Sequence, residues 1–107
     1  MIGKKVRVII DRQMGSRPPE YFDLIYEVNY GYVPGVTGGD GEEQDAYVLG
    51  VSSPVEEFDG IVIAIIHRND DIETKWVVAP ENMNFSDDEI LKAVHFQEKY
   101  FDVTVCR

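Results

Sequence analysis

Apolar and polar residues alternate along most of the chain, which predicts a series of short β-strands. The segments predicted as strands are residues 4–11, 26–32, 45–51, 61–66, 74–79 and, as a short last strand, 103–106. Residues 61–66 are continuously apolar and mostly β-branched, as expected of a strand buried on both faces. Residues 15–19 should form a loop, Pro34 and Gly35 should end the second strand, and residues 56–60 should form a hairpin turn.

The pattern becomes helical near the C-terminus. Ser86 is followed three residues later by Glu89, a capping box that marks the start of a helix. The helix is expected to run to about Tyr100, with an apolar stripe formed by Ile90, Ala93, Val94 and Phe101. About six strands and one terminal helix predict a mainly β (α+β) fold, a small closed OB-like β-barrel with the C-terminal helix packed across it.

Composition limits the functions that this fold can have. With 107 residues, of which 44% are hydrophobic, the chain is expected to form a single domain over residues 1–107 with its own core. The net charge is −10, which argues against nucleic acid as a partner, because a phosphate backbone requires a basic surface. A phosphate ligand would therefore have to arrive with a metal ion or meet one that is already bound.

The single cysteine, the polar N-terminus and the lack of a long apolar segment predict a cytoplasmic protein. Cys106 is the only cysteine, so no internal disulfide can form, and the N-terminus lacks the long apolar run of a signal peptide. No stretch approaches the ~20 apolar residues of a membrane helix, so we expect no membrane partner.

The candidate chemistry follows the tyrosine-rich second strand. Gly38 and Gly39 allow the chain to turn sharply, and four of the next six positions are acids: Asp40, Glu42, Glu43 and Asp45. Carboxylates this close repel one another unless a cation lies among them, and oxygen ligands suit a hard cation such as Mg²⁺ or Mn²⁺. The ordinary alternative is an acidic surface loop after a strand rich in tyrosine.

Together, the strand and the acids resemble soluble (family I) inorganic pyrophosphatases, of which the chain would be a short, divergent member. Their pattern is Tyr-x-x-Asn-Tyr-Gly-Tyr, a spacer, and Asp-x-Asp-Pro-x-Asp. Here the first block begins at Tyr26 and the second at Asp40, with the same spacing between them. The last acid matches as Asp45, whereas Glu42 replaces the middle Asp and Glu43 replaces the Pro.

This resemblance implies the same barrel and a Mg²⁺-dependent hydrolysis of inorganic pyrophosphate to two phosphates, with Mn²⁺ as a second candidate metal. The residues implied to bind metal are Asp40, Asp45, Asp70 and Glu73. The residues implied to bind the small phosphate-anhydride substrate are Arg12, Tyr30, Lys75 and Tyr100. The implied catalytic residues are Glu42, as general base to the attacking water, and Asp45. Family members commonly form homo-oligomers, so the resemblance also allows this chain to do so.

If the acids converge, the metal-free protein should carry repulsion that a divalent cation relieves, and Asp45→Asn should cost no stability. The resemblance is nonetheless incomplete. Phe101 occupies the position of a phosphate-binding Lys, and the Lys and Glu of the family's N-terminal strands have no counterpart. The longer side chain of Glu42 displaces its carboxylate, and a displacement of about 1 Å can cost on the order of 10²-fold in rate.

Simpler interpretations therefore remain open for several residues. Arg12 fits a surface arginine at a strand end equally well, and residues 67–73 fit an ordinary charged hairpin. The alternatives for the whole chain are a non-catalytic sensor module that binds metal and phosphate, and a purely structural acidic β-domain.

Overall fold

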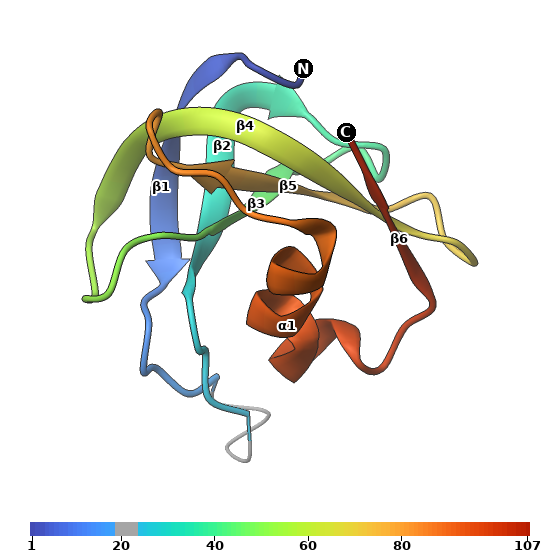
Figure 1. Ribbon diagram of the computed structural model, residues 1–107. Helices are drawn as coiled ribbons and strands as arrows, with labels where there is room; N and C mark the ends of the chain where they lie inside the picture. Colours follow the sequence, from blue (N-terminus) through green and yellow to red (C-terminus); the bar gives the residue numbers. More distant parts are fainter. Residues whose placement is uncertain (19–23) are drawn as a thin grey trace.

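The computed structural model describes residues 1–18 and 24–107 as a β-barrel with one helix packed against its side (Figure 1). Its elements are β1 (Lys5–Arg12), β2 (Asn29–Thr37), β3 (Glu43–Val48), β4 (Glu57–Arg68), β5 (Thr74–Ala79), α1 (Asp87–Glu98) and β6 (Val103–Cys106). The strand order is β1-β2-β3-β5-β4, and β4 also pairs with β1, so that five strands close the barrel. The predicted mainly β fold, a closed OB-like barrel with one C-terminal helix, is confirmed.

β6 adds to β4 outside the closed barrel, and β3 and β5 run parallel whereas the other pairs are antiparallel. The β5 and β6 bounds agree with the predicted segments. The loop predicted at residues 15–19 lies partly outside the described residues. Within residues 1–18 and 24–107, no helix is long and apolar enough to cross a membrane.

β2 and β4 differ from the prediction. β2 begins at Asn29 and continues past Pro34 and Gly35, because an irregular register between Val33 and Thr37 accommodates both residues within the β2–β3 pairing. The strand therefore does not end where the Pro-Gly pair suggested, and it reaches the acidic turn that precedes β3.

The predicted hairpin turn at residues 56–60 is wrong, because most of this segment is the first part of β4. Phe58 lies opposite Val8 and Gly60 lies opposite Val6 in the β1–β4 ladder that closes the barrel. The acids Glu57 and Asp59 alternate with these residues and are exposed. These acids lie on the outer face of a strand, whereas the sequence pattern predicted a polar turn.

Two apolar clusters stabilise the domain, one inside the barrel and one between the barrel and α1. The inner cluster draws only on the five barrel strands and consists of Val8, Ile10, Val33, Ala46, Val48, Val62, Trp76 and Val78. The outer cluster combines residues of three strands, of the segments next to β2 and β3, and of the helix: Tyr26, Val28, Tyr47, Leu49, Ala64, Ile66, Val77, Ile90, Val94 and Phe96. Alternate residues of one strand thus enter different clusters, which explains why residues 61–66 are apolar without interruption.

Asn29, in the tyrosine-rich block, has a structural role. Its side chain is fully buried and its oxygen accepts hydrogen bonds from the backbone N–H groups of Met14 (2.9 Å) and Val55 (3.3 Å). Its amide nitrogen donates to the carbonyl oxygen of Ser53 at 3.0 Å. One side chain therefore joins the segment after β1 to the segment after β3, and both of its polar atoms are used in these contacts.

Gly31 is likewise required by packing. It lies opposite Ile10 in the β1–β2 ladder, and a Cβ atom there would lie 1.8 Å from the carbonyl oxygen of Ile9. No side chain fits at that distance. Asn29 and Gly31 thus have structural roles in the barrel. The tyrosines are the remaining candidate functional residues of the tyrosine-rich block.

The helix begins as predicted. Ser86 caps it by accepting a hydrogen bond from the N–H of Glu89, whose side chain accepts one from the N–H of Ser86. Ile90 and Val94 follow at a spacing of four on the buried face, and the next residue at that spacing is Glu98, only 3% exposed. The apolar face of the helix therefore ends in a buried carboxylate.

Candidate functional site

The outward positions of three strands change from apolar or aromatic to charged at one end of the barrel. The residues are Ile66 then Arg68 on β4, Val77 then Lys75 on β5, and Tyr47 then Asp45 on β3. Ile66 lies opposite Lys75, and the parallel register of β3 and β5 places Asp45 beside Lys75. Because α1 also ends there with Glu98, the charged ends of all four elements meet at the edge of the outer apolar cluster.

Lys75 is at the centre of this arrangement, with a side chain that is only 4% exposed. Its ammonium group donates to the hydroxyl of Tyr30 (2.8 Å), to Asp45 (2.7 Å) and to Glu73 (2.5 Å). Three acceptors use all three of its N–H groups. Burial, and then the charge of Asp45, raises the pKa of Tyr30, so this hydroxyl keeps its proton.

Arg68 forms the second cationic centre and is 8% exposed. Its Nε and Nη2 donate to the two carboxylate oxygens of Glu98 (3.0 and 2.9 Å), and its Nη1 donates to Glu73 (3.0 Å). The guanidinium lies 3.6 Å from the centroid of the Phe101 ring. Burial alone would lower the pKa of Arg68, but the hydrogen bonds and charge of Glu98, and the charge of Glu73, outweigh it and raise the pKa.

A chain of hydrogen bonds continues from Glu98 into the aromatic part of the outer cluster. Tyr47 donates its hydroxyl to Glu98 (2.5 Å) and accepts from the amide of Gln97 (2.6 Å). Tyr26 donates to the same amide's oxygen at 2.8 Å. Burial, and then the charge of Glu98, raises the pKa of Tyr47, which therefore remains a neutral donor.

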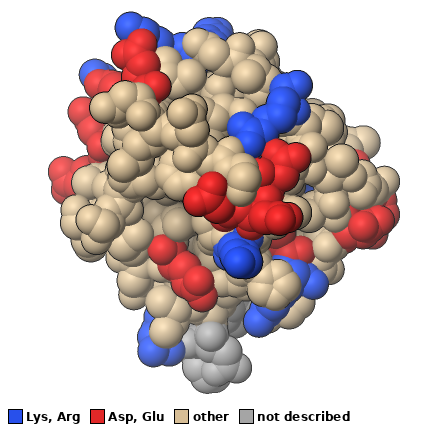
Figure 2. All heavy atoms as spheres, viewed as in Figure 1, with Lys and Arg blue, Asp and Glu red and all other residues tan. Residues whose placement is uncertain are grey.

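Glu73 has both of its carboxylate oxygens bound to protein cations. Lys75 contacts Oε1 and Arg68 contacts Oε2. The cluster contains three carboxylates, those of Asp45, Glu73 and Glu98, and the two cations neutralise most of their charge. The predicted repulsion among site acids is therefore wrong for Asp45 and Glu73, because each is ion-paired. On the face of the molecule drawn in Figure 2, exposed acidic and basic side chains also lie next to one another.

The turn between β2 and β3 carries the other predicted acids. Asp40 and Glu42 are both exposed, and an oxygen of Asp40 accepts from the backbone N–H of Glu42 at 3.0 Å. Gly39 packs against the loop after β4, since a Cβ atom at Gly39 would lie 2.6 Å from the carbonyl oxygen of Ile72. Asp70 is exposed on that second loop. The two acidic loops are thus neighbours, as the resemblance implied.

The predicted metal ligands do not form a ready-made metal centre. Across residues 1–18 and 24–107, no group of three or more Asp, Glu, His or Cys side chains is placed to hold a metal ion. Asp45 is the most accessible acid of the ion-paired cluster, at 31% exposed. Mg²⁺ commonly uses one or two carboxylates together with water and substrate phosphate oxygens. Asp40 is exposed and Asp45 partly so, whereas both oxygens of Glu73 are already bound to cations.

The predicted substrate-binding residues divide into two groups. Tyr30 and Lys75 are in direct contact, and Arg12 lies opposite Tyr30 in the β1–β2 ladder. Burial raises the pKa of Tyr26, and the positive charge of Arg12 opposes this. Tyr100, in contrast, is 70% exposed beyond the end of α1, with its ring beside Lys99. The structure therefore brings Arg12, Tyr30 and Lys75 to one edge and leaves Tyr100 at the surface.

Arg68 and Glu98 belong to this site, although the sequence patterns did not single them out. Each is a charged residue on the same face as buried apolar residues, which the sequence can reveal. Glu98 follows Val94 by four positions on the helix, and Arg68 follows Ile66 by two positions on a strand. A charge in such a position must be paired when it is buried. Phe101, assigned to the helix stripe and to the place of a phosphate-binding Lys, instead covers the guanidinium of Arg68.

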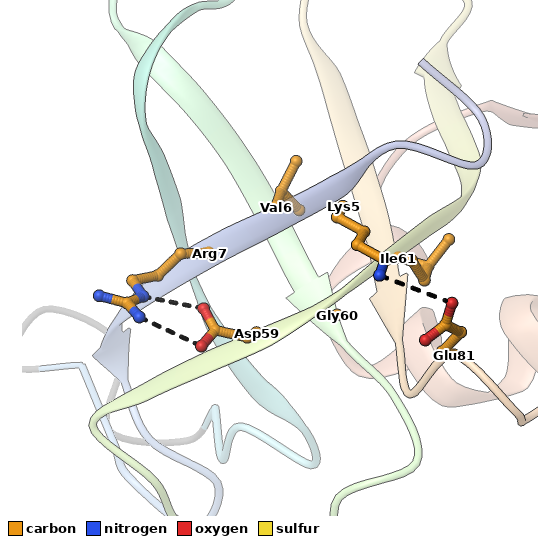
Figure 3. Close-up of a pocket in the computed structure, with 7 residues that line it drawn as sticks. All are labelled: Lys5, Val6, Arg7, Asp59, Gly60, Ile61 and Glu81. Atoms are coloured by element: carbon orange, nitrogen blue, oxygen red, sulfur yellow. Dashed lines mark hydrogen bonds and ion pairs between the residues drawn. The ribbon is translucent and has the colours of Figure 1, made fainter.

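A separate hollow of about 670 Å³ lies on β1 and β4 (Figure 3). Its lining residues are Lys5, Val6, Arg7, Asp59, Gly60, Ile61 and Glu81. Arg7 is bonded to Asp59 at 2.8 Å, and Lys5 lies 3.9 Å from Glu81. Because the charged side chains of this hollow are mostly exposed, whereas those of the ion-paired cluster are largely buried, we place the candidate site at that cluster.

Solved structures of inorganic pyrophosphatases are similar to this chain in fold. The enzyme from Ehrlichia chaffeensis aligns with 96% of this chain and 85% of its own, at 21% identity and a TM-score of 0.73. The Coxiella burnetii enzyme aligns over 98% and 87%, at 19% identity and a TM-score of 0.68. The Helicobacter pylori enzyme aligns over 95% and 82%, at 18% identity and a TM-score of 0.64. No protein-family model and no curated protein sequence matches the chain.

Proposed function

We propose that the protein is a Mg²⁺-dependent hydrolase that splits inorganic pyrophosphate into two phosphates. The observation that carries this proposal is the contact of Asp45, Lys75 and Tyr30 at the end of a barrel whose solved relatives are inorganic pyrophosphatases. An acid, a cation and a neutral hydroxyl donor provide complementary partners for a metal–phosphate complex.

The net charge of −10 favours pyrophosphate that arrives together with metal over the bare anion. Mg²⁺ would lower the pKa of a bound water and neutralise phosphate charge when it is present. Asp45, with Asp40 from the adjacent turn, is the pair of acids that would hold it, since the oxygens of Glu73 are already bound.

The chain's own groups would then bind and orient the substrate. Lys75 would exchange one of its present acceptors for a phosphate oxygen, and Tyr30 would remain a neutral donor because its pKa is raised. Arg12 would approach from the neighbouring strand. Glu42, exposed on the turn beside Asp40, would accept the proton of the attacking water.

Phosphate release from pyrophosphate, measured with Mg²⁺ and with EDTA, tests the proposal directly. We expect release with Mg²⁺ and none above background with EDTA. Release that is no faster with Mg²⁺ than with EDTA, in folded protein, would exclude hydrolysis of pyrophosphate at this site.

A second candidate is a non-catalytic module that binds the metal–pyrophosphate complex. The specific observation in its favour is Glu73, whose two oxygens are occupied by Lys75 and Arg68. A site with fewer free acids can retain ligand and still lack the metal-activated water needed for hydrolysis. Calorimetric binding of pyrophosphate with Mg²⁺, without phosphate release, would favour this candidate over the enzyme.

Glu42→Gln tests the general base. We expect a loss of at least about 10²-fold in Mg²⁺-dependent phosphate release, because Gln cannot accept the proton of water. Glu42→Asp should retain activity or increase it, because it restores the shorter side chain of the resembled family. The matched control is Glu43→Gln, which removes a neighbouring exposed acid and should leave the rate unchanged. Equal rates for Glu42→Gln and wild type would remove Glu42 from the mechanism.

A further inference from the structure

We infer that Arg68 occupies the place of a divalent cation in this site, holding Glu73 in an ion pair that withdraws it from metal coordination. The inference rests on the proposed function only in taking Asp45 and Asp40 as the acids that would hold the metal ion. Its test measures metal binding and not turnover, so the two ideas can fail separately.

The geometry leaves Glu73 no oxygen free of a cation. Lys75 lies 2.5 Å from Oε1 and Arg68 lies 3.0 Å from Oε2. Together the two side chains carry the charge of one divalent cation and contact the carboxylate on both sides. A metal ion that binds Glu73 must either displace one of these cations, leaving a buried cation with one partner fewer, or share an oxygen with it against the repulsion between the two positive charges.

Arg68 is the less easily displaced of the two. Its guanidinium is bonded to both oxygens of Glu98 and lies over the ring of Phe101. Glu98 is held in turn by the hydroxyl of Tyr47 and by its position at the buried end of α1. A planar guanidinium with bidentate contacts has little freedom to turn away, whereas a Lys ammonium can move on its flexible stem.

The first test uses the double variant Arg68→Gln with Glu98→Gln. Replacing both residues frees Oε2 of Glu73 without leaving Glu98 as an unpaired buried charge, and it keeps the net charge at −10. We expect calorimetry to show Mn²⁺ binding at least about tenfold tighter than in wild type, the scale on which partners of metal ligands alter affinity. Adding Glu73→Gln to this variant should abolish the gain.

The matched control replaces an exposed ion pair between β1 and the start of β4, Arg7→Gln with Asp59→Asn, and should leave Mn²⁺ affinity unchanged. Equal Mn²⁺ affinity in wild type and in the folded Arg68/Glu98 double variant would overturn the inference. A gain that persists after Glu73→Gln would also overturn it.

A second test keeps Arg68 in place, so it does not depend on whether the double variant folds. If Arg68 already withdraws Glu73 from the metal, Glu73→Gln alone should leave the Mn²⁺ affinity of the wild-type site unchanged. A tenfold or greater loss of Mn²⁺ affinity in Glu73→Gln would overturn the inference, whatever the rate of pyrophosphate hydrolysis.

Discussion

Asp45→Asn is expected to lower Mg²⁺-dependent phosphate release from pyrophosphate on the order of 10²–10³-fold, and also to lower the melting temperature. The loss of rate follows because Asp45 is the accessible acid of the cluster and Asn brings no negative charge to a metal–phosphate complex. The loss of stability follows because Lys75, 4% exposed, exchanges a charged acceptor at 2.7 Å for a neutral one. We expect a cost of about 1–3 kcal/mol in the free energy of unfolding.

Measuring the rate of phosphate release and the melting temperature on the same variant separates a role of Asp45 in the reaction from a role in stability. Asp59→Asn is the control, since Asp59 is an exposed acid paired with Arg7 outside the cluster, and it should change neither rate nor fold. An Asp45→Asn protein with wild-type activity would contradict the assigned role. A variant more stable than wild type would restore the view that Asp45 is a repelled carboxylate, which its ion pair with Lys75 argues against.

Glu98→Ala is expected to destabilise the domain by about 3–5 kcal/mol, the scale on which a buried ion pair loses one partner. The change leaves Arg68 without two of its three hydrogen bonds to carboxylates and leaves the Tyr47 hydroxyl without its acceptor. A domain of this size has a total stability of about 5–15 kcal/mol, so the change should be visible in urea unfolding. Glu98→Gln should cost less, because its amide oxygen can still accept a hydrogen bond.

The pH dependence of the same contact gives an independent check. Burial alone would raise the pKa of Glu98, but hydrogen bonds from Arg68 and Tyr47 outweigh it and lower the pKa below its ordinary value of 4.5. A carboxyl group with a lowered pKa contributes stability above its ordinary pKa and loses it as pH falls through the folded-state value. The difference in melting temperature between wild type and Glu98→Gln should thus be full near neutral pH and shrink below pH 4.5. A difference independent of pH would contradict the charged form of Glu98.

Local patterns in the sequence determined the elements. Alternation with a period of two located most of the strands, a continuous apolar run located β4, and the Ser86–Glu89 capping box located the start of α1. These features depend on residues within a few positions of each other, so backbone geometry and side-chain direction are enough to predict them. The bounds of β2 and β4 were misjudged because pairing across the barrel extends strands through Pro34, Gly35 and the acids at the start of β4.

The sequence also placed Tyr30, Asp45, Glu73 and Lys75 in one region, and the structure joins them through Lys75. Only the tertiary structure decided which groups neutralise the acids. Asp45 meets Lys75 across 30 positions of the chain, and Arg68 meets Glu98 across another 30. The energy of a charge depends on its distance from other charges and on its burial, and spacing along the chain determines neither. The same acids were therefore predicted as free metal ligands, whereas the folded chain binds Asp45 and Glu73 to cations of its own.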